Sequence, residues 1–481
     1  MKNAFTHFLT RYHPRSIRSL VYMLQASEYR AADYLRWFWR TRDFLGVEQR
    51  KTLVKTPKAL VLLAVAYISV ILLDAFAIWV LLVGVVWWRY LLFLAVVVVT
   101  PFVLAYGLAA ILVITHLLQW PVEFFIVDYA KRQLRAHKAL KIGIAGSFGK
   151  TSMLEILKTV LSAGKKVAAP PGSYNTPLGI SSFVRKLKGD EDILIFELGE
   201  YYPGDVKRLC NFVQPDIGVI TGVNEAHLEK FKDLERTRKT IFELADYLKG
   251  RPLYINGESP EALGVSDSDR RGVVYYSRAG VADLKVTQHH TDLGGTSFAL
   301  KVDKVALSAH SNLLGLHQIG PLSAAAHIAL QLGLSPNQVE QGIAATKPFE
   351  HRLEPKTDAQ GVTFLDDSYN GNPDGVRAVI DFLASLKGRR WYVTPGLVEM
   401  GERKEEVHKE IGRQLARAGI EKVVFIRDSV TPFIEEGLHE AGYKGEVLWF
   451  DRALDGLAAL PNLTVKGDIV LLQNDWPDQY A

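Results

Sequence analysis

The chain has 481 residues, of which 48% are apolar, a net charge of +5 and one cysteine, Cys210. This length allows two or three domains, and a single cysteine excludes an intrachain disulfide or a metal site built from cysteines. The charge is uneven, because residues 1–58 carry 12 Lys or Arg against 4 acidic residues. A basic segment next to an apolar one favours a membrane surface as partner and argues against nucleic acid.

Residues 59–120 are the most apolar part of the chain. Up to residue 119 they contain one acidic residue, one basic residue and one histidine: Asp74, Arg89 and His116. A helix that crosses a bilayer needs about 20 apolar residues. The segment therefore predicts a transmembrane hairpin with helices near 60–86 and 91–118 and a turn at Trp87–Tyr90. Asp74 is costly in lipid, so it either faces the second helix or lies nearer the outer end of the first.

Basic residues flank this hairpin on both sides, in the arm of residues 1–58 and in a linker at 121–140. The positive-inside rule places both flanks in the cytoplasm, which requires an even number of crossings. We therefore expect a two-span protein of the cytoplasmic membrane, with its N-terminus and its downstream domains in the cytoplasm. Residues 16–40 have the pattern of an amphipathic helix, which fits either the inner membrane surface or a cytosolic helical cap.

From Lys141 the sequence has an α/β pattern. Short apolar runs at 142–145, 193–196 and 217–220 alternate with helical patterns, which predicts a parallel sheet with crossover helices. Residues 272–310 resemble a small β insert. A second series of strands is expected near 362–365, 391–394, 422–426, 446–449 and 468–472. We therefore predict an ATP-binding central domain at 141–350 and a C-terminal Rossmann-like domain at 351–481.

The strongest local motif reads Gly143-Ile-Ala-Gly146-Ser147-Phe-Gly149-Lys150-Thr151-Ser152, after a predicted strand and at the start of a predicted helix. Glycines let the backbone wrap around a phosphate, and the start of a helix supplies N–H donors. Lys150 is placed to reach the β- and γ-phosphates, and the Thr151 hydroxyl to hold Mg²⁺. The spacing departs from the standard phosphate loop, which has a glycine where this chain has Ile144.

Further motifs follow in a fixed order. They are Ser173-Tyr-Asn175-Thr176-Pro-Leu-Gly179, Phe196-Glu197-Leu-Gly199, Thr221-Gly-Val-Asn224-Glu-Ala-His227, His351-Arg352-Leu-Glu354, Leu365-Asp366-Asp367-Ser-Tyr369-Asn370 and Gly396-Leu-Val-Glu399 with His408. With them, residues 141–475 resemble the Mur ligase family. Within it the sequence is most similar to the branch that joins D-alanyl-D-alanine to a UDP-N-acetylmuramoyl tripeptide.

The resemblance implies roles for individual residues. Lys150, Glu197 and His227 are the expected catalytic residues, and Thr151, Glu197 and His227 the expected metal ligands. Glu197 follows an apolar strand, where open α/β sheets place ligands. The expected ATP-binding residues are Gly146, Ser147, Gly149, Lys150, Thr151, Ser152, Asn224, His317, Arg352, Asp366 and Asn370. Asn175 and Thr176 are expected to contact substrate.

The resemblance also implies an activity, namely ATP- and Mg²⁺-dependent formation of an amide bond through an acyl phosphate. The substrates would be a carboxylate on a UDP- or lipid-linked cell-wall precursor and an amino acid or dipeptide such as D-alanyl-D-alanine. Two alternatives stay open. One is amidation or polyglutamate formation on a lipid-linked or polymeric acceptor, and the other is a degenerate scaffold that binds ATP without catalysis.

The sequence departs from the family pattern in four places. The apolar hairpin stands where the family has its UDP-binding domain. The carbamoylated lysine expected about fourteen residues after His227 falls on Ile241, with Lys239 and Glu243 nearby. The His-Asn-x-x-Asn motif reads His317-Gln-Ile-Gly-Pro321. A late Lys-Gly-Ser-Arg segment reads Leu472-Gln-Asn-Asp475, so the pocket for the incoming amine is expected to differ.

Overall fold

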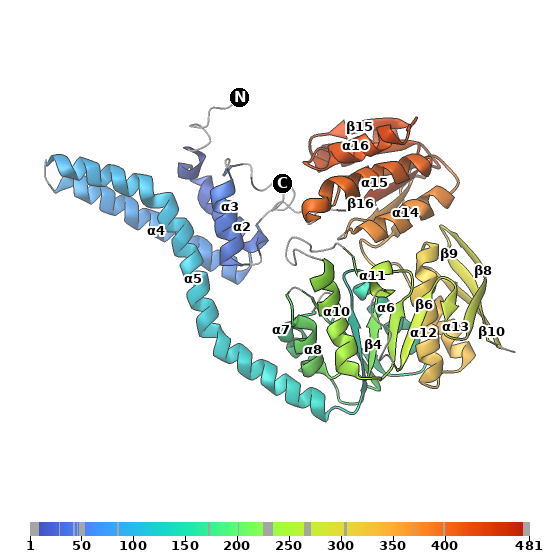
Figure 1. Ribbon diagram of the computed structural model, residues 1–481. Coiled ribbons are helices and arrows are strands. Elements are labelled where there is room, and N and C mark those ends of the chain that lie inside the picture. The colour runs from blue at the N-terminus through green and yellow to red at the C-terminus, as the bar shows by residue number, and fades with distance from the viewer. Residues whose placement is uncertain are drawn as a thin grey trace. The chain divides into compact units, whose positions relative to one another are not determined.

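The computed structural model (Figure 1) describes residues 9–27, 29–41, 44–45, 47, 53–83, 86–171, 174–200, 202–224, 234–263, 271–302, 305–369, 371–397 and 400–474. The chain forms two compact units, which divide between Phe124 and Phe125. We call residues 1–124 the N-terminal unit and residues 125–475 the C-terminal unit.

The N-terminal unit is helical. After a short 3-10 turn, η1 (Thr10–Tyr12), it contains α2 (Arg15–Ala26), α3 (Ala31–Arg40), α4 (Pro57–Leu82) and the first part of α5 (Trp87–Ala136). The prediction of a single amphipathic helix at 16–40 is wrong. The helix is interrupted between α2 and α3, where Tyr29 has a φ of 60°. The turn expected at Trp87–Tyr90 is also displaced, since α5 already begins at Trp87 and continues through the expected linker.

The apolar faces of α2 and α3 are covered by protein. They share one buried cluster with α4 and with the middle of α5, which includes Leu24, Phe38, Leu62 and Leu108. This packing fits the helical cap and leaves little of either apolar face for a lipid surface. Asp74 is exposed on α4.

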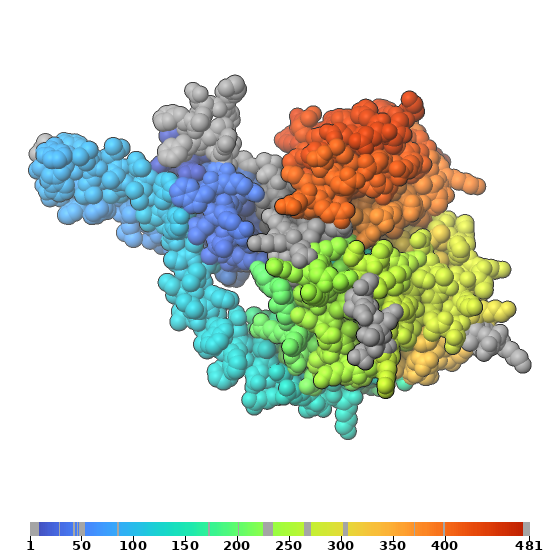
Figure 2. All heavy atoms as spheres, viewed as in Figure 1, coloured from blue at the N-terminus to red at the C-terminus, as the bar shows by residue number. Residues whose placement is uncertain are grey.

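Helices α4 and α5 are long and apolar enough to cross a membrane by length and composition, each with a mean hydropathy of 2.5 over its most apolar window. Only 17% and 33% of those windows are buried, whereas a core helix of a soluble domain would be mostly covered. Figure 2 shows the exposed side chains of these helices in light blue and cyan. By length and composition, two such helices fit the expected hairpin.

The first α/β domain of the C-terminal unit is built on a ten-stranded sheet in the order β10-β9-β8-β7-β6-β5-β4-β1-β3-β2. Its strands are β1 (Leu140–Ala145), β2 (Val167–Ala168), β3 (Ile193–Glu197), β4 (Ile217–Ile220), β5 (Leu253–Asn256), β6 (Val273–Ser277), β7 (Gly280–Val281), β8 (Leu284–Asp292), β9 (Gly295–Val302) and β10 (Val305–Ser311). Strands β1 to β6 pair in parallel, and β6 to β10 pair antiparallel. The expected β insert is therefore an extension of the main sheet.

Helices cover both faces of this sheet. One buried cluster joins the sheet to α6 (Lys150–Leu161), α12 (Ile319–Gln331) and α13 (Pro336–Ala344). A second cluster joins it to α7 (Pro177–Val184), α8 (Asp205–Val213), α10 (Leu234–Leu248) and α11 (Pro260–Leu263). Ala130 and Leu134, in the last turns of α5, belong to this second cluster, so the domain core begins before Lys141.

The second α/β domain has a six-stranded sheet in the order β11-β12-β16-β13-β14-β15. The strands are β11 (Glu354–Thr357), β12 (Thr363–Asp367), β13 (Arg390–Thr394), β14 (Lys422–Ile426), β15 (Glu446–Phe450) and β16 (Ile469–Gln473). Helices α14 (Pro373–Ser385), α15 (Lys404–Arg417) and α16 (Thr431–Glu440) pack on one face, and α17 (Ala453–Leu463) packs on the other. The five strands expected from the sequence are confirmed, while β11 is an additional antiparallel edge strand.

Candidate nucleotide and ligase site

The glycine loop lies between β1 and α6, at the carboxyl end of the parallel strands. Gly146 has a φ of +147°, and a Cβ there would lie 2.2 Å from Thr221 Oγ1, so only glycine fits. Gly149 has a φ of +73° and directly precedes α6. The Ser147 amide donates to Gly222 O at 3.0 Å, which holds the loop against the end of β4. The sequence is thus folded locally for close approach of an anion to the first turn of α6.

Lys150 is held inside this site by a buried acid. Its Nζ donates to Gly146 O and lies 2.7 Å from Glu200 Oε1. The side chains of Lys150 and Glu200 are 13% and 2% exposed, respectively. Our sequence interpretation missed Glu200. The available signal was a second acid three residues after Glu197, in the same loop that follows β3.

Glu197 ends β3 and is buried. Burial raises the pKa of its carboxyl, while the charge of Lys150 and a hydrogen bond from Thr151 act in the opposite direction. Within the part of the chain that the structure describes, Glu197 Oε1 and Glu200 Oε2 are buried without a hydrogen-bond partner. Buried carboxylate oxygens beside a threonine hydroxyl are the donor set that Mg²⁺ prefers.

The expected third ligand, His227, lies outside the described residues, as does the expected ATP-binding residue Asn370. Among the residues that are described, no group of three or more His, Cys, Asp or Glu side chains is arranged to hold a metal ion. Of the three expected metal ligands, Thr151 and Glu197 therefore lie within the described residues.

Asn224 connects the glycine loop to the second α/β domain. Its backbone amide donates to Ser147 Oγ at 3.3 Å. Its side-chain Nδ2 donates to Asn372 Oδ1 at 2.9 Å and to Asp374 Oδ2 at 3.1 Å. Asn372 is the N-cap of α14 and accepts from the Gly375 amide as well. The start of α14 is thereby fixed to the phosphate side of the first domain.

Arg352 stands at the junction between the two domains. Its guanidinium lies 4.8 Å from the centre of the Tyr369 ring. Burial lowers its pKa, and the charges of Asp367, Tyr369 and Glu197 oppose that shift. The electrostatic link to Glu197 places a cation from the junction near the glycine-loop site, as an ATP-binding role would require.

The two aspartates at the end of β12 differ in their surroundings. Asp366 accepts hydrogen bonds from Ser368 Oγ at 2.7 Å and lies 2.8 Å from His351 Nδ1. Burial would raise its pKa, but these hydrogen bonds outweigh burial and leave the pKa lowered. Burial raises the pKa of Asp367 to about 6, against the opposing charge of Arg352 and a hydrogen bond from Gln473.

His317 lies in the 3-10 turn η2 (Leu316–Gln318), which directly precedes α12. Burial, together with the nearby charge of Arg278, lowers its pKa to about 4, so the imidazole is neutral at pH 7. Its Nε2 lies 2.9 Å from Gln318 Nε2. Within the described structure its Nδ1 has no hydrogen-bond partner. Gln318, which stands where the family motif has asparagine, therefore contacts His317 directly.

The expected substrate residues follow the second strand of the sheet. Asn175 is buried, and Thr176 is the N-cap of α7, where its hydroxyl accepts from the Gly179 amide at 3.3 Å. Capping explains Thr176 without a ligand. Ser152 lies in the first turn of α6 and is partly buried. The roles assigned to these three residues stay predictions.

The segment expected to carry a modified lysine lies in α10. Ile241 is fully buried, whereas the Lys239 side chain is 74% exposed and lies 3.7 Å from Glu235. Glu243 accepts from the Gly204 and Lys207 amides at the start of α8. None of these three residues offers a buried lysine for carbamoylation.

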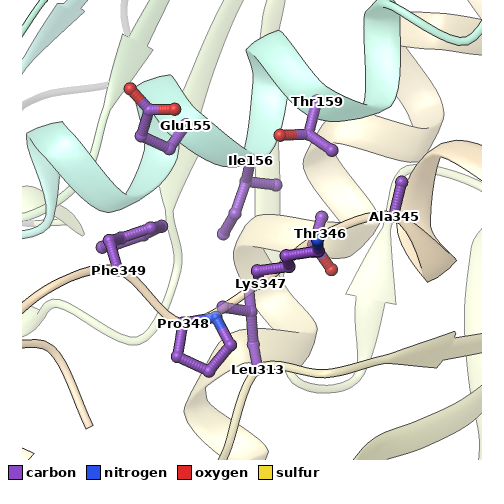
Figure 3. Close-up of a pocket in the computed structure, with 9 residues that line it drawn as sticks. All are labelled: Glu155, Ile156, Thr159, Leu313, Ala345, Thr346, Lys347, Pro348 and Phe349. Atoms are coloured by element: carbon purple, nitrogen blue, oxygen red, sulfur yellow. The ribbon is translucent and has the colours of Figure 1, made fainter. Parts of the chain in front are cut away.

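A separate hollow of about 200 Å³ lies beside α6 (Figure 3). It is lined by Glu155, Ile156, Thr159, Leu313, Ala345, Thr346, Lys347, Pro348 and Phe349. In Figure 3, Glu155, Ile156 and Thr159 project from α6, one turn or more beyond Thr151. No predicted site residue lines this hollow, so it is distinct from the glycine-loop site.

A glycine loop between the first strand of a parallel sheet and a helix, followed by a second α/β domain, defines a two-domain protein of the phosphate-loop class. Comparison with known proteins gives the family. Residues 144–329 match the Mur ligase middle domain, and residues 351–473 match the Mur ligase glutamate ligase domain. The chain belongs to the Mur ligase family and is an ATP-dependent amide-bond ligase by class.

Two sequence relatives agree with this assignment, and a solved structure has a similar fold. UDP-N-acetylmuramoyl-tripeptide--D-alanyl-D-alanine ligase of Mycobacterium tuberculosis strain CDC 1551 is 31% identical, over 71% of this chain and 71% of that protein. The enzyme of the same name from Bacillus subtilis is 27% identical, over 72% and 75%. The fold is similar to that of MurF ligase from Thermotoga maritima in complex with ADP, with a TM-score of 0.65, 24% identity, and coverage of 73% and 80%.

Proposed function

We propose that this chain is a membrane-anchored ligase that joins an amino acid or dipeptide to a carboxylate of a peptidoglycan precursor, with ATP as the energy source. D-alanyl-D-alanine is the amine component named for the relatives from M. tuberculosis and B. subtilis, and a UDP-muramoyl tripeptide is the named acceptor. The observation that carries the proposal is the contact of the partly buried Lys150 with the buried Glu200, beside the buried Glu197, at the glycine loop. A scaffold that only binds its partners has no need of this buried charge cluster.

The geometry supports a two-step reaction. In the first step a substrate carboxylate oxygen attacks the γ-phosphorus of ATP, the bond to the bridging β-phosphate oxygen breaks, and ADP leaves. Lys150 and the amides at the start of α6 stabilise the negative charge on the phosphoryl oxygens. In the second step the amine attacks the acyl carbon, its nitrogen gives up a proton to the departing phosphate or to water, and inorganic phosphate leaves with the electron pair of the broken C–O bond. Arg352, on the domain junction, adds positive charge near the same site.

Mg²⁺ fits the same site. Thr151 and Glu197 would hold the ion, which, when bound, neutralises charge on the β- and γ-phosphates. The residues themselves orient the nucleotide, and the hydrogen bonds from Asn224 to α14 keep the two domains together around it.

The membrane anchor rests on α4 and α5, which lie outside both family matches. Positive flanks favour a cytoplasmic location for both termini of the hairpin and for the ligase domains. This anchor also favours a second candidate, in which the acceptor is linked to lipid and not to UDP, because the hairpin would hold the site near the membrane surface. Amidation and polyglutamate formation would use the same acyl phosphate chemistry.

The test is amine-dependent ADP release by full-length protein purified in detergent. The acceptors are UDP-muramoyl tripeptide, its lipid-linked form or none, each with and without D-alanyl-D-alanine. We expect turnover with one muramoyl acceptor and the dipeptide, and loss of turnover in Lys150→Ala. Turnover confined to the lipid-linked form would select the second candidate. ATP binding without turnover for any pair would contradict the proposal and favour a scaffold.

A further inference from the structure

Two buried carboxylates share one lysine beside the glycine loop. Glu197 and Glu200 are 4% and 3% exposed, and Glu200 is close enough for its charge to act on Glu197. Lys150 contacts Glu200 at 2.7 Å. One oxygen of each carboxylate, Glu197 Oε1 and Glu200 Oε2, has no hydrogen-bond partner among the described residues. Buried anionic oxygens are rarely left in this state unless they have a ligand.

Nucleotide binding changes the charge balance of this cluster. Lys150 is the residue of the glycine loop expected to reach the β- and γ-phosphates, and it has one charge to share. Once Lys150 contacts a phosphate, Glu200 loses its ion pair while it stays buried. A buried carboxylate without a counter-charge is strongly destabilising. A second cation entering with the nucleotide removes that cost.

We propose that Glu200 is a second carboxylate ligand of the divalent cation that accompanies the nucleotide, together with Glu197 and Thr151. Before the nucleotide binds, Lys150 forms an ion pair with the Glu200 carboxylate. When the nucleotide binds, the metal ion takes the place of Lys150 at this carboxylate. Mg²⁺ characteristically uses one or two protein carboxylates and completes its shell with phosphate oxygens and water. This inference rests on the proposed function only in requiring that the site binds a nucleotide.

The competing explanation is that Glu200 only positions Lys150. Glu200→Gln separates the two. A glutamine keeps the size of the side chain and still accepts a hydrogen bond from Lys150, but a neutral amide oxygen is a much weaker ligand for a hard cation. Glu155→Gln is the matched control, because Glu155 also acts on Glu197 through its charge but pairs with Lys158 on α6.

The experiment measures Mn²⁺ binding to the full-length protein in detergent by electron paramagnetic resonance, with a non-hydrolysable ATP analogue. The affinity for the analogue is also measured in EDTA by calorimetry. We expect Glu200→Gln to weaken Mn²⁺ binding by about 10-fold to 100-fold. The affinity in EDTA should change by less than about threefold, because the neutral contact to Lys150 remains. Glu155→Gln should leave both values near those of the wild type.

An Mn²⁺ affinity unchanged in Glu200→Gln, with weaker nucleotide binding in EDTA, would overturn the proposal and leave Glu200 as a positioning residue. If Glu200→Gln does not fold, Glu200→Asp is measured instead. It keeps the charge but withdraws the oxygens by one methylene, and the same loss of Mn²⁺ affinity is expected. These readouts do not depend on an acceptor or an amine, so a failure of the ligase assay is distinguishable from a failure of this inference.

Discussion

Lys150 Nζ and Glu200 Oε1 are 2.7 Å apart, with the lysine side chain 13% exposed and the glutamate side chain 2% exposed. The charge of Lys150, the phosphate-loop lysine expected to contact the nucleotide, is therefore neutralised by Glu200 from the loop that follows β3. This pairing links the stability of the nucleotide-free protein to the chemistry of the site, because the same charge serves both.

Replacement of Lys150 should separate its contribution to stability from its contribution to the reaction. Lys150→Ala leaves the Glu200 carboxylate buried without its partner, which costs about 3–5 kcal/mol of stability. It also removes a stabilising charge from the reaction and should lower ADP formation by about 10²-fold to 10³-fold. In Lys150→Ala/Glu200→Gln the melting temperature should recover most of the loss while activity stays low. A double variant as unstable as the single one would show that the ion pair is not the cause.

The hydrogen bond from Asn224 to Asn372 predicts energetic coupling between the two α/β domains. A double-mutant cycle with Asn224→Ala and Asn372→Ala should give a coupling energy of about 0.5–1.5 kcal/mol in chemical unfolding. Asn372→Ala should cost about 1 kcal/mol more than Asn224→Ala, since it also removes the N-cap of α14. Asn372→Ser, which keeps a capping oxygen, is the control for that second loss. Strictly additive effects would contradict the coupling.

The raised pKa of Asp367 predicts a stability contribution that decreases as pH rises. Its folded pKa is about 6 and its ordinary value is 3.8, so between these values the folded protein holds a proton that the unfolded chain has lost. The unfolding free energy should therefore fall by about 2 kcal/mol from this group between pH 4 and pH 6. Asp367→Asn should remove this contribution, so that melting curves show a steeper rise in stability from pH 4 to pH 6 than in the wild type. An unchanged slope would show that Asp367 is ionised throughout.

The lowered pKa of His317 predicts a stability contribution that increases as pH rises. Its pKa falls from an ordinary 6.5 to about 4 in the folded protein, so the unfolded chain binds the extra proton between these values. Its contribution to stability is present above pH 6.5 and is lost as pH falls toward 4, by about 3 kcal/mol. In His317→Gln this loss on acidification should disappear, and the profile should then show the slope of Asp367 more clearly. A parallel profile in wild type and variant would contradict the assignment.

Much of the fold followed from local sequence patterns. Strands such as β1, β13 and β14 are short apolar runs bounded by turns, and this pattern is typical of buried parallel strands. Local patterns could not predict that β6 to β10 continue the main sheet. This continuity depends on which strands pair with one another, and a single strand's sequence does not specify its partner. The break at Tyr29 was also hidden, since a non-glycine residue with positive φ carries no local signal.

The site was predictable in part for the same reason. Lys150 and Thr151 belong to a contiguous motif whose backbone geometry dictates its residues, and the structure places both beside Glu197. Glu200 was missed because its importance depends on burial and on the Lys150 contact, neither of which the spacing reveals. The capping role of Thr176 likewise became visible only from its contact with the Gly179 amide.

The domain boundary gives the last prediction. The core of the first α/β domain includes Ala130 and Leu134 from the end of α5, although the α/β pattern in the sequence begins at Lys141. A chain that begins at Phe125 should fold and bind ADP with the affinity of the full-length protein. A chain that begins at Lys141 should be less stable by about 2–5 kcal/mol for the loss of the Leu134 side chain alone. Calorimetric ADP titrations and melting curves test both. Equal stability of the two truncations would show that the end of α5 is dispensable, and loss of ADP binding in the longer one would show that the N-terminal unit supports the nucleotide site.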